Sequence, residues 1–151
     1  TSALPSGAFE ALTAVEQYIE AQFSDPVTAV INIGFAPLGS GILGSTSSSY
    51  TSVSWPTARA GLQTGMDAND TIQDFLPSTS TIPVRYTGAS TSVTNENQVF
   101  FTLANHRATI GTVSGTAASM TFNSNFAWDY APPGISPGAY CFQSVAAHEV
   151  A

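Results

Sequence analysis

The fold of this chain is decided by the stretch Phe142-Gln143-Ser144-Val145-Ala146-Ala147-His148-Glu149-Val150-Ala151. Phe142, Val145 and Ala146 lie three or four residues apart, and this spacing places them on one face of a helix. That face is apolar, so it can pack beneath a sheet while His148 and Glu149 point into a cleft. The stretch therefore predicts a helix with one buried face and a polar end that can carry chemistry.

His148 and Glu149 match the first half of the motif H-E-x-x-H, and the quoted stretch stops one residue before the second histidine. The full motif places two imidazoles one turn apart on a helix, so that both reach the same Zn²⁺ while the glutamate polarises the attacking water. A His-Glu pair alone is more often an exposed part of an ordinary helix. The apolar face before His148 and the small residues Ala146 and Ala147 favour the catalytic interpretation.

The stretch 142–151 resembles the start of the active-site helix of metzincin-type zinc peptidases, which commonly continues as His, Ala or Gly, Leu, Gly. The run 120–130 resembles the strand and turn that precede this helix in a secreted microbial branch of that family. The N-terminal order of helix, strand and glycine-rich loop is also similar. The resemblance implies an α+β fold, with a mixed twisted sheet and packed helices that form the upper subdomain of a metzincin-like peptidase.

The same resemblance implies roles for two residues and a cofactor. Glu149 would be catalytic, taking a proton from the attacking water and passing it to the leaving amine, and His148 would be a ligand of zinc in the complete protein. The substrate would be a peptide or protein. Catalytic zinc normally needs three protein ligands, so the other ligands, a glycine turn and the methionine turn are expected beyond Ala151. The 151 residues alone are therefore expected to be inactive and to bind zinc weakly.

Composition narrows the class of protein. Hydrophobic residues make up 43% of the chain and charged residues only 9%, which predicts one globular domain over 1–151, the N-terminal part of a catalytic domain. The net charge is -7, with three basic residues, all arginine, and ten acidic ones. This balance disfavours nucleic acid and anionic membrane surfaces as partners. Low charge with many Ser and Thr residues favours a secreted, extracellular protein.

Apolar periodicity and breaker residues predict the other elements. They are helices over about 6–23, 56–65, 70–76 and 95–106, strands over about 27–35, 84–87 and 118–122, a Gly- and Ser-rich surface loop over 37–49, and a Pro- and Gly-rich turn over 132–138. Asp70 is expected to cap the helix at 70–76 through a capping box, and Asn95 to cap the helix at 95–106.

Several other residues have simple structural explanations. His106 is expected to interact with helix carbonyls, Cys141 to be a buried core thiol, the three aspartates to cap and solvate loops, and the large aromatics near proline turns to anchor cores. The aspartates are Asp67, Asp70 and Asp74, and the aromatics are Trp55, Trp128 and Tyr130.

Two further function classes remain open. The leading alternative is a structural or self-assembling extracellular protein of peptidase-like ancestry, because Ser, Thr and β-branched residues with little charge favour edge-to-edge strand pairing into filaments. Electron microscopy separates the two, since a peptidase fragment gives dispersed particles and a structural protein gives ordered polymers. A weaker third possibility is a carbohydrate- or peptide-binding module that uses the aromatic residues.

Overall fold

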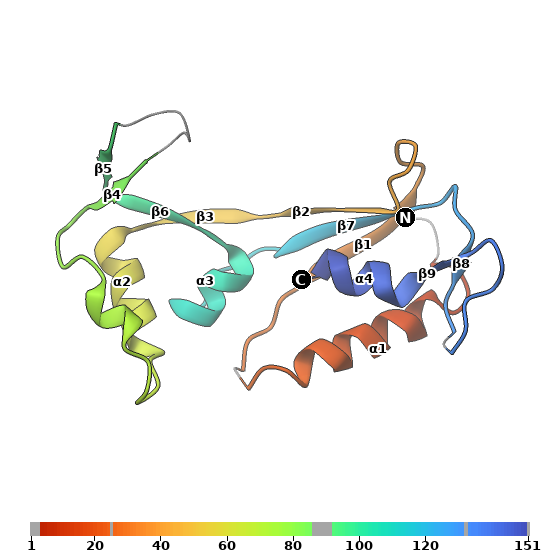
Figure 1. Cartoon of the computed structure of the whole chain (residues 1–151), viewed down its shortest axis with the longest axis horizontal. Coiled ribbons are helices and arrows are strands. Elements are labelled where there is room, and N and C mark those ends of the chain that lie inside the picture. Colours follow the sequence, from red (N-terminus) through yellow and green to blue (C-terminus); the bar gives the residue numbers. More distant parts are fainter. Residues whose placement is uncertain (1–3, 25, 86–91, 132, 151) are drawn as a thin grey trace. The chain divides into compact units, whose positions relative to one another are not determined.

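A computed structural model describes residues 4–24, 26–85, 92–131 and 133–150 (Figure 1). The predicted α+β class is confirmed, since helices and small sheets alternate along the chain. Its elements are α1 (Ala8–Glu20), β1 (Ile31–Ala36), β2 (Gly44–Ser48), β3 (Tyr50–Ser54), α2 (Trp55–Thr64), the 3₁₀ helix η1 (Ile72–Phe75), β4 (Ile82–Val84), β5 (Thr94–Glu96), β6 (Gln98–Thr102), α3 (Leu103–Thr109), β7 (Ala118–Asn123), β8 (Trp128–Asp129), β9 (Tyr140–Cys141) and α4 (Phe142–Val150).

The chain forms two compact units, which we describe separately. Unit 1 comprises Thr1–Pro26, Val30–Ser48 and Ala118–Ala151, and unit 2 comprises Val27–Ala29 and Ser49–Ala117. The expectation of a single domain over 1–151 stays a prediction.

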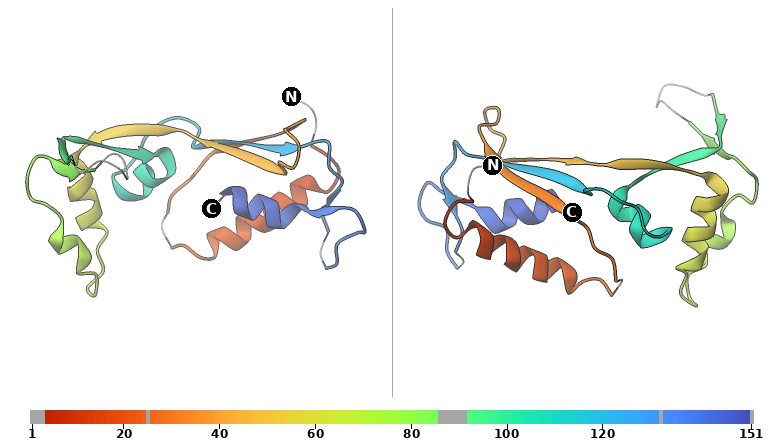
Figure 2. Two further views of the ribbon diagram at one scale, coloured as in Figure 1. Left: turned by 45° about the horizontal axis from the view of Figure 1, so that its top comes forward. Right: turned by 180° about the vertical axis from the view of Figure 1, so that it is seen from behind.

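Unit 1 is built on a mixed sheet with the strand order β1-β7-β2. β1 runs parallel to the central strand β7, with Ile31 opposite Ala118, whereas β2 runs antiparallel to it, with Gly44 opposite Phe122. Helices α1 and α4 lie side by side against one face of this sheet (Figures 1 and 2). β2 is therefore an outer strand, and α4 packs close to it.

The core of unit 1 lies between the sheet and the two helices. It contains Ala11, Val15, Met120, Phe122, Phe142 and Ala146. The Phe142 ring at the start of α4 packs 4.5 Å from the ring centre of Phe122 and 5.8 Å from that of Phe35. Aromatic pairs at these separations add to the stabilisation from burial. Because Phe142 and Ala146 are fully buried, the predicted apolar face of the last helix is confirmed, and the packing fixes its rotation about its axis.

Unit 2 contains two small sheets and the remaining helices. β3 pairs antiparallel with β6, and β4 pairs antiparallel with β5. Helix α2 begins where predicted, because the Ser54 side chain accepts a hydrogen bond from the Thr57 N–H and Pro56 lies in the first turn. Trp55 is buried there and its indole donates to the Pro77 carbonyl, as expected of a core anchor.

The Gly- and Ser-rich segment over 37–49 was wrongly predicted to be entirely loop, since its second half is strand β2. Glycine and serine have little intrinsic preference for strands, so local propensity argued against this assignment. Pairing with the buried strand β7 supplies the missing stabilisation, and such pairing depends on residues far apart in sequence.

The helix predicted over 95–106 is also wrong in its first half. Val99 and Phe100 belong to β6, and the helix begins only at Leu103, where Thr102 and not Asn95 provides the cap by accepting from the Asn105 N–H. β-Branched and aromatic residues favour strands once a partner strand is present. β3 is that partner.

Other boundaries differ in smaller ways. The strand expected over 27–35 begins only at Ile31, and the helix expected over 70–76 is the single 3₁₀ turn η1. η1 lacks a side-chain cap, because the Asp70 carboxylate accepts from the Asp67 N–H instead. Of the strand expected over 84–87, only Val84 is strand, as the last residue of β4, and Arg85 already lies outside it. Residues 86–87 lie outside the described part, as does 132 in the predicted turn.

Among the described residues, no helix has both the length and the apolar character needed to cross a membrane.

Candidate active site

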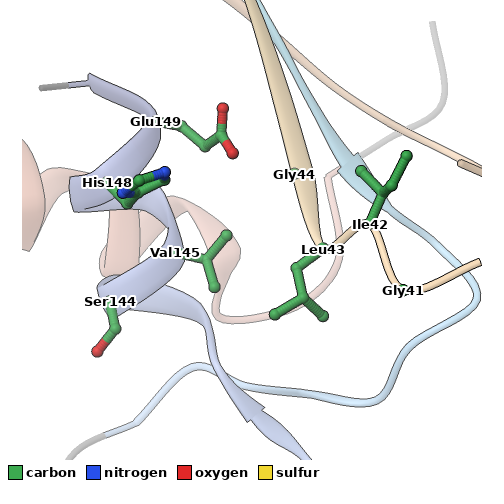
Figure 3. A pocket seen from close by; sticks show the side chains of 8 residues that line it. All are labelled: Gly41, Ile42, Leu43, Gly44, Ser144, Val145, His148 and Glu149. Carbon is green, nitrogen blue, oxygen red and sulfur yellow. The ribbon is translucent and has the colours of Figure 1, made fainter.

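The end of α4 that carries His148 and Glu149 borders a pocket of about 410 Å³ in unit 1. We call it the α4–β2 pocket, and its lining consists of Gly41, Ile42, Leu43, Gly44, Ser144, Val145, His148 and Glu149 (Figure 3). The pocket thus joins one side of α4 to the beginning of β2 and the loop before it. The two neighbouring residues singled out from the sequence both line this pocket, and their roles in catalysis and metal binding stay predictions.

Glu149 extends from α4 toward β2 (Figure 3). Its carboxylate oxygen Oε2 accepts a hydrogen bond of 2.6 Å from the Thr46 hydroxyl, which also lies 3.1 Å from the Glu149 main-chain oxygen. Hydrogen bonds to an ionised carboxylate are shorter and stronger than those between neutral groups. Glu149 is half-buried and its carboxylate is hydrogen-bonded to β2, so its side chain is less free to rotate than that of an exposed glutamate.

Gly44 makes room for that carboxylate. A Cβ atom at this position would lie 2.7 Å from Glu149 Oε1 and 3.0 Å from both Cδ and Cγ. Contacts below 3.0 Å are essentially never seen for a real Cβ, so any side chain at position 44 would displace Glu149. The requirement for glycine is steric, because the position has no unusual backbone conformation.

His148 lies beside Glu149 on the pocket wall and is exposed to solvent. Its imidazole is a donor that zinc commonly binds. The part of the chain that the structure describes contains no group of three or more His, Cys, Asp or Glu side chains positioned to hold a metal ion. His148 is thus a single candidate donor, and zinc binding stays a prediction.

The opposite wall of the pocket is held in place by Asn123, whose side chain is only 1% exposed. Its amide nitrogen donates to the Ile42 carbonyl at 2.8 Å, and its amide oxygen accepts from the Leu38 N–H at 3.2 Å. Its own backbone N–H donates to the Leu43 carbonyl at 2.9 Å. A buried amide with satisfied hydrogen bonds fixes the backbone around it. Asn123 thus fixes the loop that brings Ile42 and Leu43 to the pocket.

The turn that leads into α4 is stabilised by Asp129. Its carboxylate accepts from the backbone N–H groups of Ser136 and Ala131. The Ser136 side chain, together with these two N–H groups, holds the pKa of the Asp129 carboxyl below its ordinary value. Beside it, burial raises the pKa of the Tyr130 hydroxyl. The Tyr130 ring packs 4.9 Å from the ring centre of Phe142 at the edge of the core, as expected of a core anchor.

The remaining candidates lie elsewhere. His106 is in unit 2, and its Nδ1 lies 3.1 Å from the carbonyl of Gly111, a residue that follows the end of α3. This contact is therefore with the segment after the helix and not with the helix carbonyls that were expected. Cys141 is half-buried in β9 and accepts a hydrogen bond from the Ser144 hydroxyl, so the expectation of a fully buried core thiol is wrong. It lies in a short strand at the edge of the core, where solvent still reaches it.

Local sequence patterns gave little indication that Gly44, Thr46 or Asn123 belong to the site. Gly44 and Thr46 stand in a Gly- and Ser-rich run whose composition predicts a loop, and the half-buried side that they share in β2 is evident only in the structure. Asn123 directly follows the strand predicted over 118–122, a position where asparagine is common because it favours turns. Its importance comes from atoms some 80 positions earlier in the chain.

Comparisons with protein-family models, curated proteins and solved structures found no match to this chain.

Proposed function

We propose that this chain is the N-terminal part of the catalytic domain of a secreted, metzincin-like zinc endopeptidase, with Glu149 as the general base and His148 as the first metal ligand. The observation that carries the proposal is the anchored Glu149 carboxylate on the wall of the α4–β2 pocket, directly beside an exposed imidazole. The sequence resemblance of the terminal helix and the low-charge, Ser- and Thr-rich composition support it.

The place of Glu149 on the pocket wall supports this role. A general base must lie within hydrogen-bond reach of the water whose proton it takes, and the proposal puts that water in the α4–β2 pocket. Glu149 would accept that proton and then deliver it to the leaving amine nitrogen as the peptide bond breaks. When bound, zinc would polarise the scissile carbonyl and acidify the attacking water.

Strand β2 offers a means of holding a peptide substrate. It is an outer strand of its sheet, and extended peptides bind such edges by adding one more strand through main-chain hydrogen bonds. Ile42, Leu43 and Val145 give the adjoining pocket an apolar lining. A peptide held along β2 would therefore have an apolar side chain near Glu149.

Two variants of the protein that the complete gene encodes test the proposal. Glu149→Gln keeps the size of the side chain but removes the base, so zinc should still bind while kcat falls roughly 10²- to 10⁴-fold. His148→Ala should instead lower the zinc content measured by atomic absorption. Glu16→Gln, on an exposed position of α1, is the matched control and should leave both unchanged.

The gene itself provides a further check. The proposal expects a histidine directly after Ala151 and a third ligand after a glycine-containing turn. Near-normal hydrolysis by zinc-loaded Glu149→Gln, or a gene that encodes no further ligand, would contradict the proposal.

A further inference from the structure

We propose that Thr46 is the positioning residue of Glu149: its hydroxyl holds Oε2, so that Oε1 remains free to act as the base in the α4–β2 pocket. This inference rests on the proposed function. It assigns a role to strand β2 that the terminal helix alone does not contain.

The geometry of Thr46 suits this role. Thr46 and Gly44 are two residues apart in β2, so both face the same side of the sheet, and both are half-buried while Ser45 and Ser47 are exposed. Helix α4 packs against this strand. On the side of β2 that faces Glu149, Gly44 therefore leaves space for the carboxylate and Thr46 supplies a hydroxyl.

The Thr46 hydroxyl has one proton and two acceptors within reach. The carboxylate oxygen is closer, at 2.6 Å against 3.1 Å for the main-chain oxygen, and it carries charge. The proton is therefore donated mainly to Oε2. Threonine is β-branched, which restricts its χ1 angle, so the paired strand presents the hydroxyl in a narrow range of directions.

Fixing Oε2 leaves Oε1 as the oxygen available for proton transfer. Oε1 is the carboxylate atom nearest to the site of the absent Gly44 side chain, and no donor among the described residues is hydrogen-bonded to it. A glutamate side chain otherwise rotates about three bonds. Holding one oxygen removes most of that freedom before the substrate arrives, and misplacing a catalytic group by about 1 Å can cost on the order of 10²-fold in rate.

The test uses the complete, zinc-loaded protein. Thr46→Val keeps the shape and the β-branch but removes the hydroxyl, and we expect kcat to fall roughly tenfold to a hundredfold with KM and zinc content unchanged. Thr46→Ser keeps the donor and should restore most of the activity. Ser47→Ala removes a hydroxyl from the exposed side of the same strand and is the matched control.

A second readout does not depend on activity. In the metal-free protein, Thr46→Val should lower the urea midpoint of unit 1 in the wild-type background but much less in a Glu149→Ala background, where the carboxylate is absent. Equal shifts in both backgrounds would show that the hydroxyl does not act on the carboxylate, and would overturn the inference.

The outcomes separate the two proposals. If Glu149→Gln abolishes hydrolysis while Thr46→Val retains full kcat, the positioning role is wrong and the proposed function stands. If Glu149→Gln retains activity, the proposed function fails and this inference fails with it. Should Thr46→Val not fold, Thr46→Ser and Thr46→Ala form the comparison, and equal loss of kcat in both would refute the role of the hydroxyl.

Discussion

Replacing Gly44 by alanine tests the geometry of the α4–β2 pocket most directly. The new Cβ would lie 2.7 Å from Glu149 Oε1, inside the 3.0 Å below which real Cβ contacts are essentially never seen, so the carboxylate must move, and reaching an ordinary 3.4 Å contact takes about 0.7 Å. The end of a glutamate side chain can move at little steric cost. Its hydrogen bond to Thr46 cannot survive such a move unchanged.

The magnitude follows from two opposing effects. Losing a half-buried hydrogen bond to a charged group costs about 1 to 2 kcal/mol of the free energy of unfolding. Replacing glycine by alanine at a compatible strand position raises the free energy of unfolding by about 0.4 to 1 kcal/mol, because the unfolded chain loses conformational freedom. Gly34→Ala, in β1 of the same unit, has only the second effect, since nothing lies within 4 Å of its added Cβ. Gly44→Ala should therefore be about 1 to 2 kcal/mol less stable than Gly34→Ala.

The assay is urea unfolding followed by the fluorescence of Trp128, which lies in unit 1. Trp55 belongs to unit 2, so every protein in the series carries Trp55→Phe. In a Glu149→Ala background the clash disappears, and Gly44→Ala should then behave like Gly34→Ala. Equal stability of the two alanine variants in the wild-type background would refute the close approach of Glu149 to β2. A loss of stability in Gly44→Ala that persists in the Glu149→Ala background would refute it as well.

Two further predictions concern the wall of the pocket and the turn before α4. Asn123→Ala leaves the Leu38 N–H and the Ile42 carbonyl without their partner, so the free energy of unfolding of unit 1, measured in urea, should fall by about 2 to 4 kcal/mol. Asn125→Ala, at an exposed position, is the control and should change it little. A loss at Asn123 no larger than that at Asn125 would contradict the role of Asn123 in fixing the loop. Asp129→Asn should lower the thermal midpoint at neutral pH. Because the pKa of Asp129 is lowered in the folded state, its stabilising contribution is complete well above the ordinary carboxyl pKa and disappears as the pH falls through the folded-state pKa. The thermal midpoints of wild type and variant should therefore converge at acid pH. A difference between the two midpoints that stayed constant with pH would rule out this charge effect.

The elements that the sequence predicted well are those whose signal is local. Helix α1 follows from apolar residues at a helical period, α2 from a proline that fits the first turn, and α4 from the apolar face that includes Phe142 and Ala146. These features depend on residues within one or two turns of one another. The chemical types of His148 and Glu149 could be read in the same way, together with their place at the end of a helix.

Only the tertiary structure decided what those two residues face. β2 and β6 were missed because their stabilisation comes from partner strands far along the chain, and pairing with β7 turns a Gly- and Ser-rich run into a strand. The same pairing places Gly44 and Thr46 against Glu149 across about 100 positions of sequence. Local composition determined the helix and its reactive groups, whereas long-range strand pairing determined the space beside them and the hydroxyl that holds the carboxylate.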